Sequence, residues 1–303
     1  MKYFIAIPTY NGGSIWRDAV HNIQQYTPAD LLVQVIDSSS KDETLSIAKE
    51  AGFSVKIIAS KDFNHGGTRN LAVSEHAQDN DIVIFLTQDA IPEPEFIEKI
   101  ISAFDDDQVA CAWGRQLPHN NANPIAQHAR YFNYPPEGHV CSMQDSPEYG
   151  LKTVFMSNSF SAYRIKNFQE LGGFPSNTIL CEDMYFTAKA VLAGYKVAYV
   201  SDAVVRHSHN YLPMDEFRRY FDIGVFHAEQ PWIRERFGGA GDEGKKFIIS
   251  EARYLFKNGI LYIPLALLNN LMKIIGYKIG QKYKYLPRTL IKFFSMHKRF
   301  WNF

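Results

Sequence analysis

Short apolar runs alternate with longer amphipathic segments through the first hundred residues of the chain. Four of the runs predict buried strands, and the segments between them predict helices. The predicted strands are 4–7, 32–36, 55–59 and 82–86, and the predicted helices are 14–25, 42–51 and 68–77. Ser40 or Asp42 is placed to cap the second of these helices. Alternation of this kind is typical of an α/β domain, in which helices cover a mainly parallel, Rossmann-like sheet.

The periodicity weakens between 116 and 150, where Asn, Pro, His and Gly are frequent. This stretch predicts a long loop or lid with a short helix at 126–132. Regular structure then resumes, with strands expected at 153–163 and 196–200 and helices at 165–171 and 182–193. After His209 the chain is expected to be mainly helical. We therefore predict an α/β domain over residues 1–210 and a helical extension over residues 211–303.

Composition places the chain among globular proteins with a sizeable core. It has 303 residues, of which 46% are hydrophobic and 14% aromatic. Basic and acidic residues balance overall, but from Lys245 onward Glu251 is the single acid against about a dozen Lys and Arg. This asymmetry predicts a tail that meets an anionic surface. The three widely spaced cysteines indicate a reducing compartment, with neither a disulfide framework nor a Cys-based zinc site.

Residues 277–303 interleave basic and aromatic side chains, a mixture that suits an anionic membrane interface. A C-terminal helix that simply packs over the domain is an alternative, and nucleic-acid binding is disfavoured because no recognised module accompanies the segment. The most apolar stretch, 260–275, falls short of the roughly 20 residues that a spanning helix requires. The run at 3–7 ends at Pro8, before it reaches the length of a signal-peptide core.

Polar segments follow all four of the first predicted strands. They are Pro8–Asn11, Asp37–Asp42, Asn64–Asn70 and Thr87–Asp89. Ligands bind beyond the carboxyl ends of parallel strands, so these segments are expected to gather at one edge. Asp37 can accept a hydrogen bond from a base imide, Tyr10 can lie against a ring, and Gly66-Gly67 lets backbone N–H groups approach a ligand. Each segment alone also fits an ordinary loop, but together they favour a nucleotide site.

The usual phosphate-binding loops are absent, since there is no GxGxxG after the first strand and no GxxxxGK[ST] in the chain. A divalent cation held by Asp89 is the natural group to neutralise a diphosphate. His207 or His209 completes such a site if the fold brings that strand end near Asp89. On spacing alone, an HxH pair is more often a structural or solvent-facing feature than a pair of metal ligands.

Taken in order, the motifs resemble those of family 2 glycosyltransferases, whose GT-A fold is a Rossmann-like mixed sheet flanked by helices. The resemblance spans about residues 3–209 and rests on the four segments above together with Leu171-Gly172-Gly173-Phe174, Glu182-Asp183 and Gly194-Tyr195. The variants at 64–70, 87–90 and 207–211 are most similar to bacterial rhamnosyltransferases of surface-polysaccharide (O-antigen) synthesis, which use dTDP-L-rhamnose as donor.

The resemblance implies a donor pocket in which Asp37 holds the pyrimidine base and Arg69 lies near the phosphates or ribose. The residues that it assigns to the donor are Thr9, Tyr10, Asn11, Asp37, Gly67, Arg69, Gln88 and Asp89. Asp89 matches the last aspartate of the DxD metal motif, but Thr87 stands at the first position. A further ligand such as His207 is therefore needed to hold Mg²⁺ or Mn²⁺.

Asp183 matches the general base of the family, which implies inverting transfer to a saccharide acceptor, lipid-linked or free. The alternative for Glu182-Asp183 is a charged first helical turn. Ser157, Asn158 and Tyr163 are candidates for the acceptor side or plain hydrogen-bonded strand residues. The resemblance implies a cytoplasmic enzyme, peripheral at the inner face of the membrane.

Two other classes of protein remain open on the sequence. A catalytically silent nucleotide-sugar-binding or scaffold protein is suggested by the missing first aspartate. A nucleotidyltransferase is disfavoured because the chain lacks an N-terminal Gly-rich loop with a basic signature.

Overall fold

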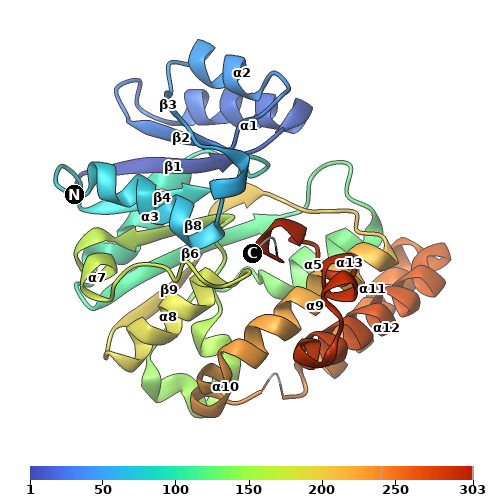
Figure 1. Ribbon diagram of the computed structural model, residues 1–303. Coiled ribbons are helices and arrows are strands. Elements are labelled where there is room, and N and C mark those ends of the chain that lie inside the picture. The colour runs from blue at the N-terminus through green and yellow to red at the C-terminus, as the bar shows by residue number, and fades with distance from the viewer. Residues whose placement is uncertain (240, 302–303) are drawn as a thin grey trace.

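The computed structural model describes residues 1–239 and 241–301, in which one nine-stranded sheet carries helices on both faces (Figure 1). The strand order is β3-β2-β1-β4-β8-β6-β9-β5, with β7 paired to β9. The strands are β1 (Tyr3–Thr9), β2 (Val33–Asp37), β3 (Ser54–Ile57), β4 (Ile82–Leu86), β5 (Ile91–Pro92), β6 (Val109–Leu117), β7 (His139–Cys141), β8 (Phe160–Arg164) and β9 (Lys196–Arg206). β1 to β4 pair in parallel, whereas β8 runs antiparallel to both β4 and β6, so the sheet is mixed.

Alternation of side chains along β1 builds two hydrophobic layers. Ile5 and Ile7 face α1 (Gly13–Tyr26), α2 (Thr44–Glu50) and α4 (Phe96–Ile101), while Phe4 and Ala6 belong to the layer on the opposite face. That second layer is covered by α3 (His65–His76), α7 (Ile165–Glu170), α8 (Glu182–Leu192) and α9 (Pro213–Glu229). Burial on both faces explains why β4 reads as a continuous apolar run, whereas the equally buried β2 includes Gln34.

Most of the C-terminal helices pack onto the second layer and share its hydrophobic core. They are α9, α10 (Pro231–Phe237), α12 (Ile263–Gly280) and α13 (Arg288–Phe294), while α11 (Glu243–Asn258) packs with α12 in a separate small cluster. α12 lies directly against α9, because a Cβ on Gly276 would stand 2.3 Å from the Phe217 carbonyl oxygen and a Cβ on Gly280 2.1 Å from that of Phe221. Glycine at these two positions is therefore what lets the helix backbones touch.

Most elements of the first half match the sequence-based predictions within two or three residues. The stretch at 116–150 is more ordered than predicted: it holds the end of β6, α5 (Pro124–Asn133, the short helix expected at 126–132), β7 and α6 (Ser146–Tyr149). The strand predicted at 153–163 is wrong in its first half, where a 3₁₀ turn (Gly150–Val154) and a loop precede β8. The strand predicted at 196–200 continues to Arg206.

The length argument against a membrane-spanning helix is also wrong. The helical stretch Ile260–Gly280 has 21 residues and a mean hydropathy of 1.4, which by length and composition alone suffices to cross a membrane. Its contacts argue for a different placement, since Asn269, Asn270 and Lys273 face the protein and only Lys278 is exposed. Asn270 donates to Glu251 at 2.6 Å, and the Lys273 ammonium lies 3.3 Å from the Glu216 carboxylate.

Candidate functional site

The carboxyl ends of β1 and β2 are tied together by Asp37. Parallel pairing sets Thr9 beside Asp37, and Thr9 Oγ1 donates to Asp37 Oδ2 at 2.8 Å. Ser40 donates to the same carboxylate through its hydroxyl at 2.6 Å and its backbone N–H at 2.8 Å. Asp37 is fully buried, so it braces the two loops from beneath. Asp42, not Ser40, meets the start of α2, where it accepts from the Thr44 N–H at 3.1 Å.

A pocket of about 360 Å³ opens above this brace, lined by Tyr10, Ser38, residues 63–65, Ile179 and residues 296–300. Ser38 is almost fully buried, and its hydroxyl makes no hydrogen bond to any other described residue. An unpartnered buried hydroxyl at a pocket wall is a ready contact for a polar ligand. No sequence signal distinguished Ser38 from its neighbours, because the direction of a side chain at a strand end depends on the fold, and the role of Asp37 at the base stays a prediction.

The loop after β1 is fixed by Gln88 and Asn11. Gln88 pairs with the Tyr10 backbone in both directions, accepting from its N–H at 2.8 Å and donating to its carbonyl at 3.2 Å. The Asn11 side chain accepts from the Lys41 N–H at 2.8 Å. These contacts leave the ring of Tyr10 partly exposed at the pocket.

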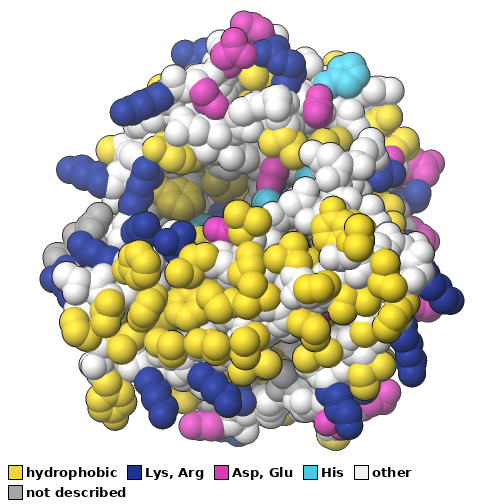
Figure 2. Space-filling view, turned by 90° about the vertical axis from the view of Figure 1, so that its right-hand side faces the viewer, with side chains coloured by type: hydrophobic (Ala, Val, Ile, Leu, Met, Phe, Trp, Pro, Cys, Tyr) yellow, Lys and Arg dark blue, Asp and Glu magenta, His cyan; other side chains and the backbone are white. Residues whose placement is uncertain are grey.

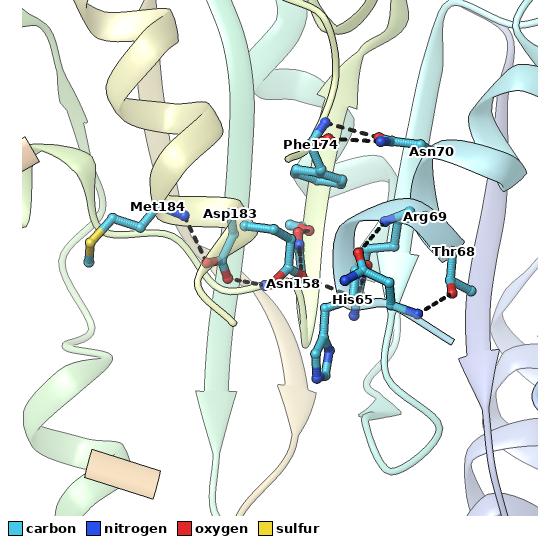
Figure 3. Close-up of polar contacts among 12 residues, drawn as sticks. His65, Thr68, Arg69, Asn70, Asn158, Phe174, Asp183 and Met184 are labelled. Carbon is cyan, nitrogen blue, oxygen red and sulfur yellow. Dashed lines mark hydrogen bonds and ion pairs between the residues drawn. The ribbon is translucent and has the colours of Figure 1, made fainter. Parts of the chain in front are cut away.

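The side chains of segment 64–70 form hydrogen bonds and an ion pair with other parts of the protein (Figure 3). Asn64 caps α3 by accepting from the Gly67 N–H at 2.8 Å, and Asn70 exchanges two hydrogen bonds with the Phe174 backbone. Arg69 is buried, with Nη1 3.2 Å from Glu182 Oε1 and 3.0 Å from the His65 carbonyl oxygen. The structure thus places the Gly67 N–H and the Arg69 guanidinium in internal contacts, and their positions beside a donor stay predictions.

Asp89, His207 and His209 form a compact cluster where β4 and β9 end. Asp89 Oδ2 lies 3.4 Å from His207 Nε2 and 3.5 Å from His209 Nε2, and the three ligand atoms are within 4.8 Å of one another. Burial alone raises the pKa of Asp89, but the adjacent His207 and His209 outweigh it and hold that pKa well below its ordinary value. Burial lowers the pKa of His209 to about 4, which leaves its imidazole neutral at pH 7.

A second layer of hydrogen bonds orients His207. The Gln116 amide nitrogen donates to Ser157 Oγ at 2.8 Å, so its oxygen is the acceptor that faces His207 Nδ1 at 2.8 Å and Arg130 Nη1 at 2.7 Å. His207 Nδ1 therefore carries a proton, and in the neutral ring Nε2 offers its lone pair toward Asp89. One carboxylate and two imidazoles presented in this way fit a divalent transition-metal ion. Gln116 and Arg130 fall in the stretch interpreted as a loop, and no sequence signal pointed to them.

The pair Glu182 and Asp183 begins α8 (Figure 3). Glu182 is buried against Arg69, and Asn158 Nδ2 donates to it at 2.9 Å. Asp183 is only partly buried and accepts from the backbone N–H groups of Asn158 at 3.1 Å and Met184 at 2.8 Å. Burial and the neighbouring Glu182 charge raise the pKa of Asp183 to about 7. The two adjacent carboxylates thus have opposite properties, one locked in an ion pair and the other poised to exchange a proton.

Asn158 holds this pair against the sheet. Its side-chain oxygen accepts from Ser161 Oγ at 2.9 Å and from the Tyr163 hydroxyl at 2.7 Å, and all three residues are buried. Tyr163 and Asn158 are therefore hydrogen-bonded interior residues, the plainer of the two readings of the sequence.

The fold and the groups gathered at this edge are those of a nucleotide-dependent group-transfer enzyme. The chain belongs to glycosyl transferase family 2, whose profile matches residues 4–172. It is 53% identical over its whole length to the O-antigen chain rhamnosyltransferase RfbN of Salmonella typhimurium, and it covers 96% of that protein. It is 50% identical over 99% of its length to the O-antigen chain rhamnosyltransferase WbaN of Salmonella anatum, again covering 96% of the relative.

Solved structures confirm the expected GT-A-type fold. The mannosyltransferase PcManGT from Pyrobaculum calidifontis, in complex with GDP-Man and Mn²⁺, aligns with 99% of this chain and 84% of its own at a TM-score of 0.57 and 18% identity. TarS 1–349 of S. aureus in complex with UDP-GlcNAc aligns with 94% of this chain and 92% of its own, at a TM-score of 0.53 and 17% identity. The protein is a glycosyltransferase, and its Asp89, His207 and His209 cluster is a possible metal site in that fold.

Proposed function

We propose that the protein transfers L-rhamnose from dTDP-L-rhamnose to a saccharide acceptor, with inversion, during assembly of a bacterial O-antigen. The observation that carries the proposal is the identity of 53% and 50% to two O-antigen chain rhamnosyltransferases along essentially the full chain. We place the acceptor on a lipid carrier at the inner face of the membrane. The catalytic domain is residues 1–210, and the helices of residues 211–303 support it.

Asp183 is the proposed general base. Its raised pKa gives it the proton affinity to take the acceptor hydroxyl proton, and two backbone N–H groups fix the direction of its carboxylate. Arg69 serves this role indirectly, since it holds Glu182 ionised and limits how far the pKa of Asp183 rises. Tyr10, Ser38 and the Asp37-braced loops form the proposed nucleotide pocket.

Asp89, His207 and His209 are the proposed ligands of the cation that neutralises the leaving diphosphate. Two imidazoles favour Mn²⁺ over Mg²⁺, because Mg²⁺ prefers a shell of oxygen ligands. The second imidazole compensates for Thr87 at the position where the family motif has its first aspartate. With this second imidazole, the absence of the first aspartate no longer favours a silent binding protein.

The donor assignment predicts that dTDP-L-rhamnose is turned over with Mn²⁺ and that dTDP binds more tightly than UDP. Calorimetry with the two nucleotides, and hydrolysis or transfer assays with a panel of nucleotide sugars, measure both. Tighter binding of UDP-glucose than of dTDP-L-rhamnose would reject the donor. Binding of dTDP-L-rhamnose without turnover on any O-antigen acceptor would instead support the silent binding protein.

We also propose that α12 is the surface that docks on the membrane. A surface helix usually turns its apolar face toward the protein, but α12 does the opposite. Asn269 and Asn270 are buried against the protein, and an apolar face is turned outward. Figure 2 shows hydrophobic side chains gathered across this side of the molecule, with Lys and Arg at its margins. The exposed apolar residues of α12 are Leu267, Leu268, Leu271, Ile274 and Ile275, and Phe256, Ile260 and Leu261 are exposed just before the helix.

An anionic bilayer is the occupant that fits this surface. The exposed residues Arg253, Lys257 and Lys278 flank it, and residues 252–301 contain no acid that would repel anionic headgroups. The buried polar side of α12 and its backbone contact with α9 favour a helix that lies in the interface over one that spans it.

The docking proposal predicts that the double variant Leu267→Glu/Leu271→Glu loses binding to vesicles containing phosphatidylglycerol. Each leucine buried in the interface is worth about 1.5–3 kcal/mol, so the expected loss exceeds about 100-fold. Ile57→Glu/Val140→Glu adds the same charge at exposed apolar positions on β3 and β7 and serves as the control. Equal sedimentation of both variants with vesicles would rule out α12 as the docking face.

A further inference from the structure

The last described residues of the chain return to the nucleotide pocket. Residues 296–300 line it together with Tyr10 and Ser38, and the dark red segment that ends the described part of the chain lies near the middle of the view in Figure 1. The Arg299 guanidinium stacks on the Tyr10 ring, 4.5 Å from its centroid, and donates to the Tyr10 hydroxyl at 2.8 Å. Arg299 also donates to Ser60 Oγ. It therefore connects the loop that follows β1, which holds Tyr10, with the turn that follows β3, which holds Ser60.

Three contacts fix the segment in this place. Asp222, fully buried on α9, accepts from the backbone N–H groups of Met296 at 2.9 Å and His297 at 3.1 Å. His297 packs edge-on against His65, with their facing nitrogens 3.3 Å apart. Phe294 packs against Phe217 and Phe221, just before the segment begins. The return path is therefore built into the core and is not a loose tail.

Among the described residues, no acidic side chain forms an ion pair with Arg299. Its described partners, Tyr10 and Ser60, are neutral, and Arg299 and Lys298 are both exposed at the pocket. The other basic candidate for this region, Arg69, is committed to Glu182, and the Gly67 N–H is committed to Asn64. A guanidinium held over a pocket by neutral partners suits an anionic ligand, and its planar donors match a phosphate.

We propose that the segment 296–301 completes the donor site and that Arg299 binds a phosphate of the nucleoside diphosphate. The inference deepens the proposed function and rests on it. Asp222 is a positioning residue in this arrangement, because it holds the backbone from which Arg299 reaches the pocket. The basic and aromatic tail then serves the donor, while membrane contact is left to α12.

The test compares dTDP with thymidine, which lacks the phosphates, by calorimetry in the presence of Mn²⁺. Arg299→Ala is expected to weaken dTDP binding about 10- to 100-fold, the worth of one charge-assisted contact, and to leave thymidine binding unchanged. Arg299→Lys should recover part of the loss. Arg236→Ala, an exposed arginine on α10, is the matched control and should bind both ligands as the wild type does.

Two further variants test the placement of the segment. Truncation after Ser295 should weaken dTDP at least as much as Arg299→Ala. Asp222→Asn should weaken dTDP and speed amide exchange at 296–301, with thymidine binding retained. Unchanged dTDP binding by Arg299→Ala or by the truncated protein would overturn the inference. Tighter dTDP binding by either would also overturn it and would show that the segment blocks the pocket. Equal loss of thymidine and dTDP would overturn the phosphate contact. Failure of the wild type to bind dTDP would reject the donor assignment instead.

Discussion

Asp183→Asn is expected to lower turnover by about 10²- to 10⁴-fold, the contribution of a positioned general base, while the Kd for dTDP stays unchanged. The substitution keeps the size of the side chain and one of the two oxygens that accept from the Asn158 and Met184 N–H groups. It removes the proton affinity that burial and Glu182 confer on the carboxylate. Single-turnover transfer rates and calorimetry with dTDP measure the two quantities separately.

The pH dependence provides the sharper control. A base must be deprotonated to act, so the wild-type rate should rise with pH through about 7, the pKa to which burial and Glu182 raise Asp183. Glu182→Gln removes the neighbouring negative charge and leaves Arg69 unpaired, and both effects lower the pKa of Asp183. The profile of this variant should therefore move to lower pH, with some loss of stability from the unpaired buried arginine. If Glu182→Gln proved the more damaging change, or if Asp183→Asn lost dTDP binding in proportion to turnover, Asp183 would not be the base.

Asp89→Ala is expected to reduce transfer by more than about 100-fold and to abolish its dependence on Mn²⁺. Loss of a group that only orients a metal ligand already costs about 10- to 100-fold, and Asp89 is the one carboxylate of the cluster. The folded state should persist, because removing Asp89 also relieves a buried charge. Titration with Mn²⁺, followed by transfer assays with and without a chelator, measures the effect.

Asp202→Ala, an exposed aspartate on β9, is the control for Asp89→Ala and should keep wild-type metal dependence. Two outcomes would contradict the metal assignment: full activity of Asp89→Ala in the presence of chelator, or unchanged Mn²⁺ affinity in that variant. His209→Ala should show an intermediate loss, because His207 remains held by Gln116.

The sequence by itself determined the alternation of strands and helices in the first half, and with it the edge at which the site lies. Buried parallel strands favour continuous apolar runs, as in β4, and their ends then fall at one edge whatever the side chains there do. Asp37 and Asp89 were singled out because each follows a strand end, whereas Asp183 was assigned only by the family resemblance, since a helix start by itself favours a plain charged first turn. The order of these motifs also identified the family.

Only the tertiary structure decided what each polar group faces. Arg69 meets Glu182, and Arg299 meets Tyr10 from 289 positions away along the chain. Asp37 accepts hydrogen bonds from Thr9 and Ser40, and Ser38 next to it lines the pocket. The partners of a buried charge are set by how distant elements pack, and no local periodicity encodes that choice. For the same reason, α12 looks in the sequence like an apolar run interrupted by polar residues. In the structure, two of these residues point inward, Lys273 at Glu216 and Asn270 at Glu251.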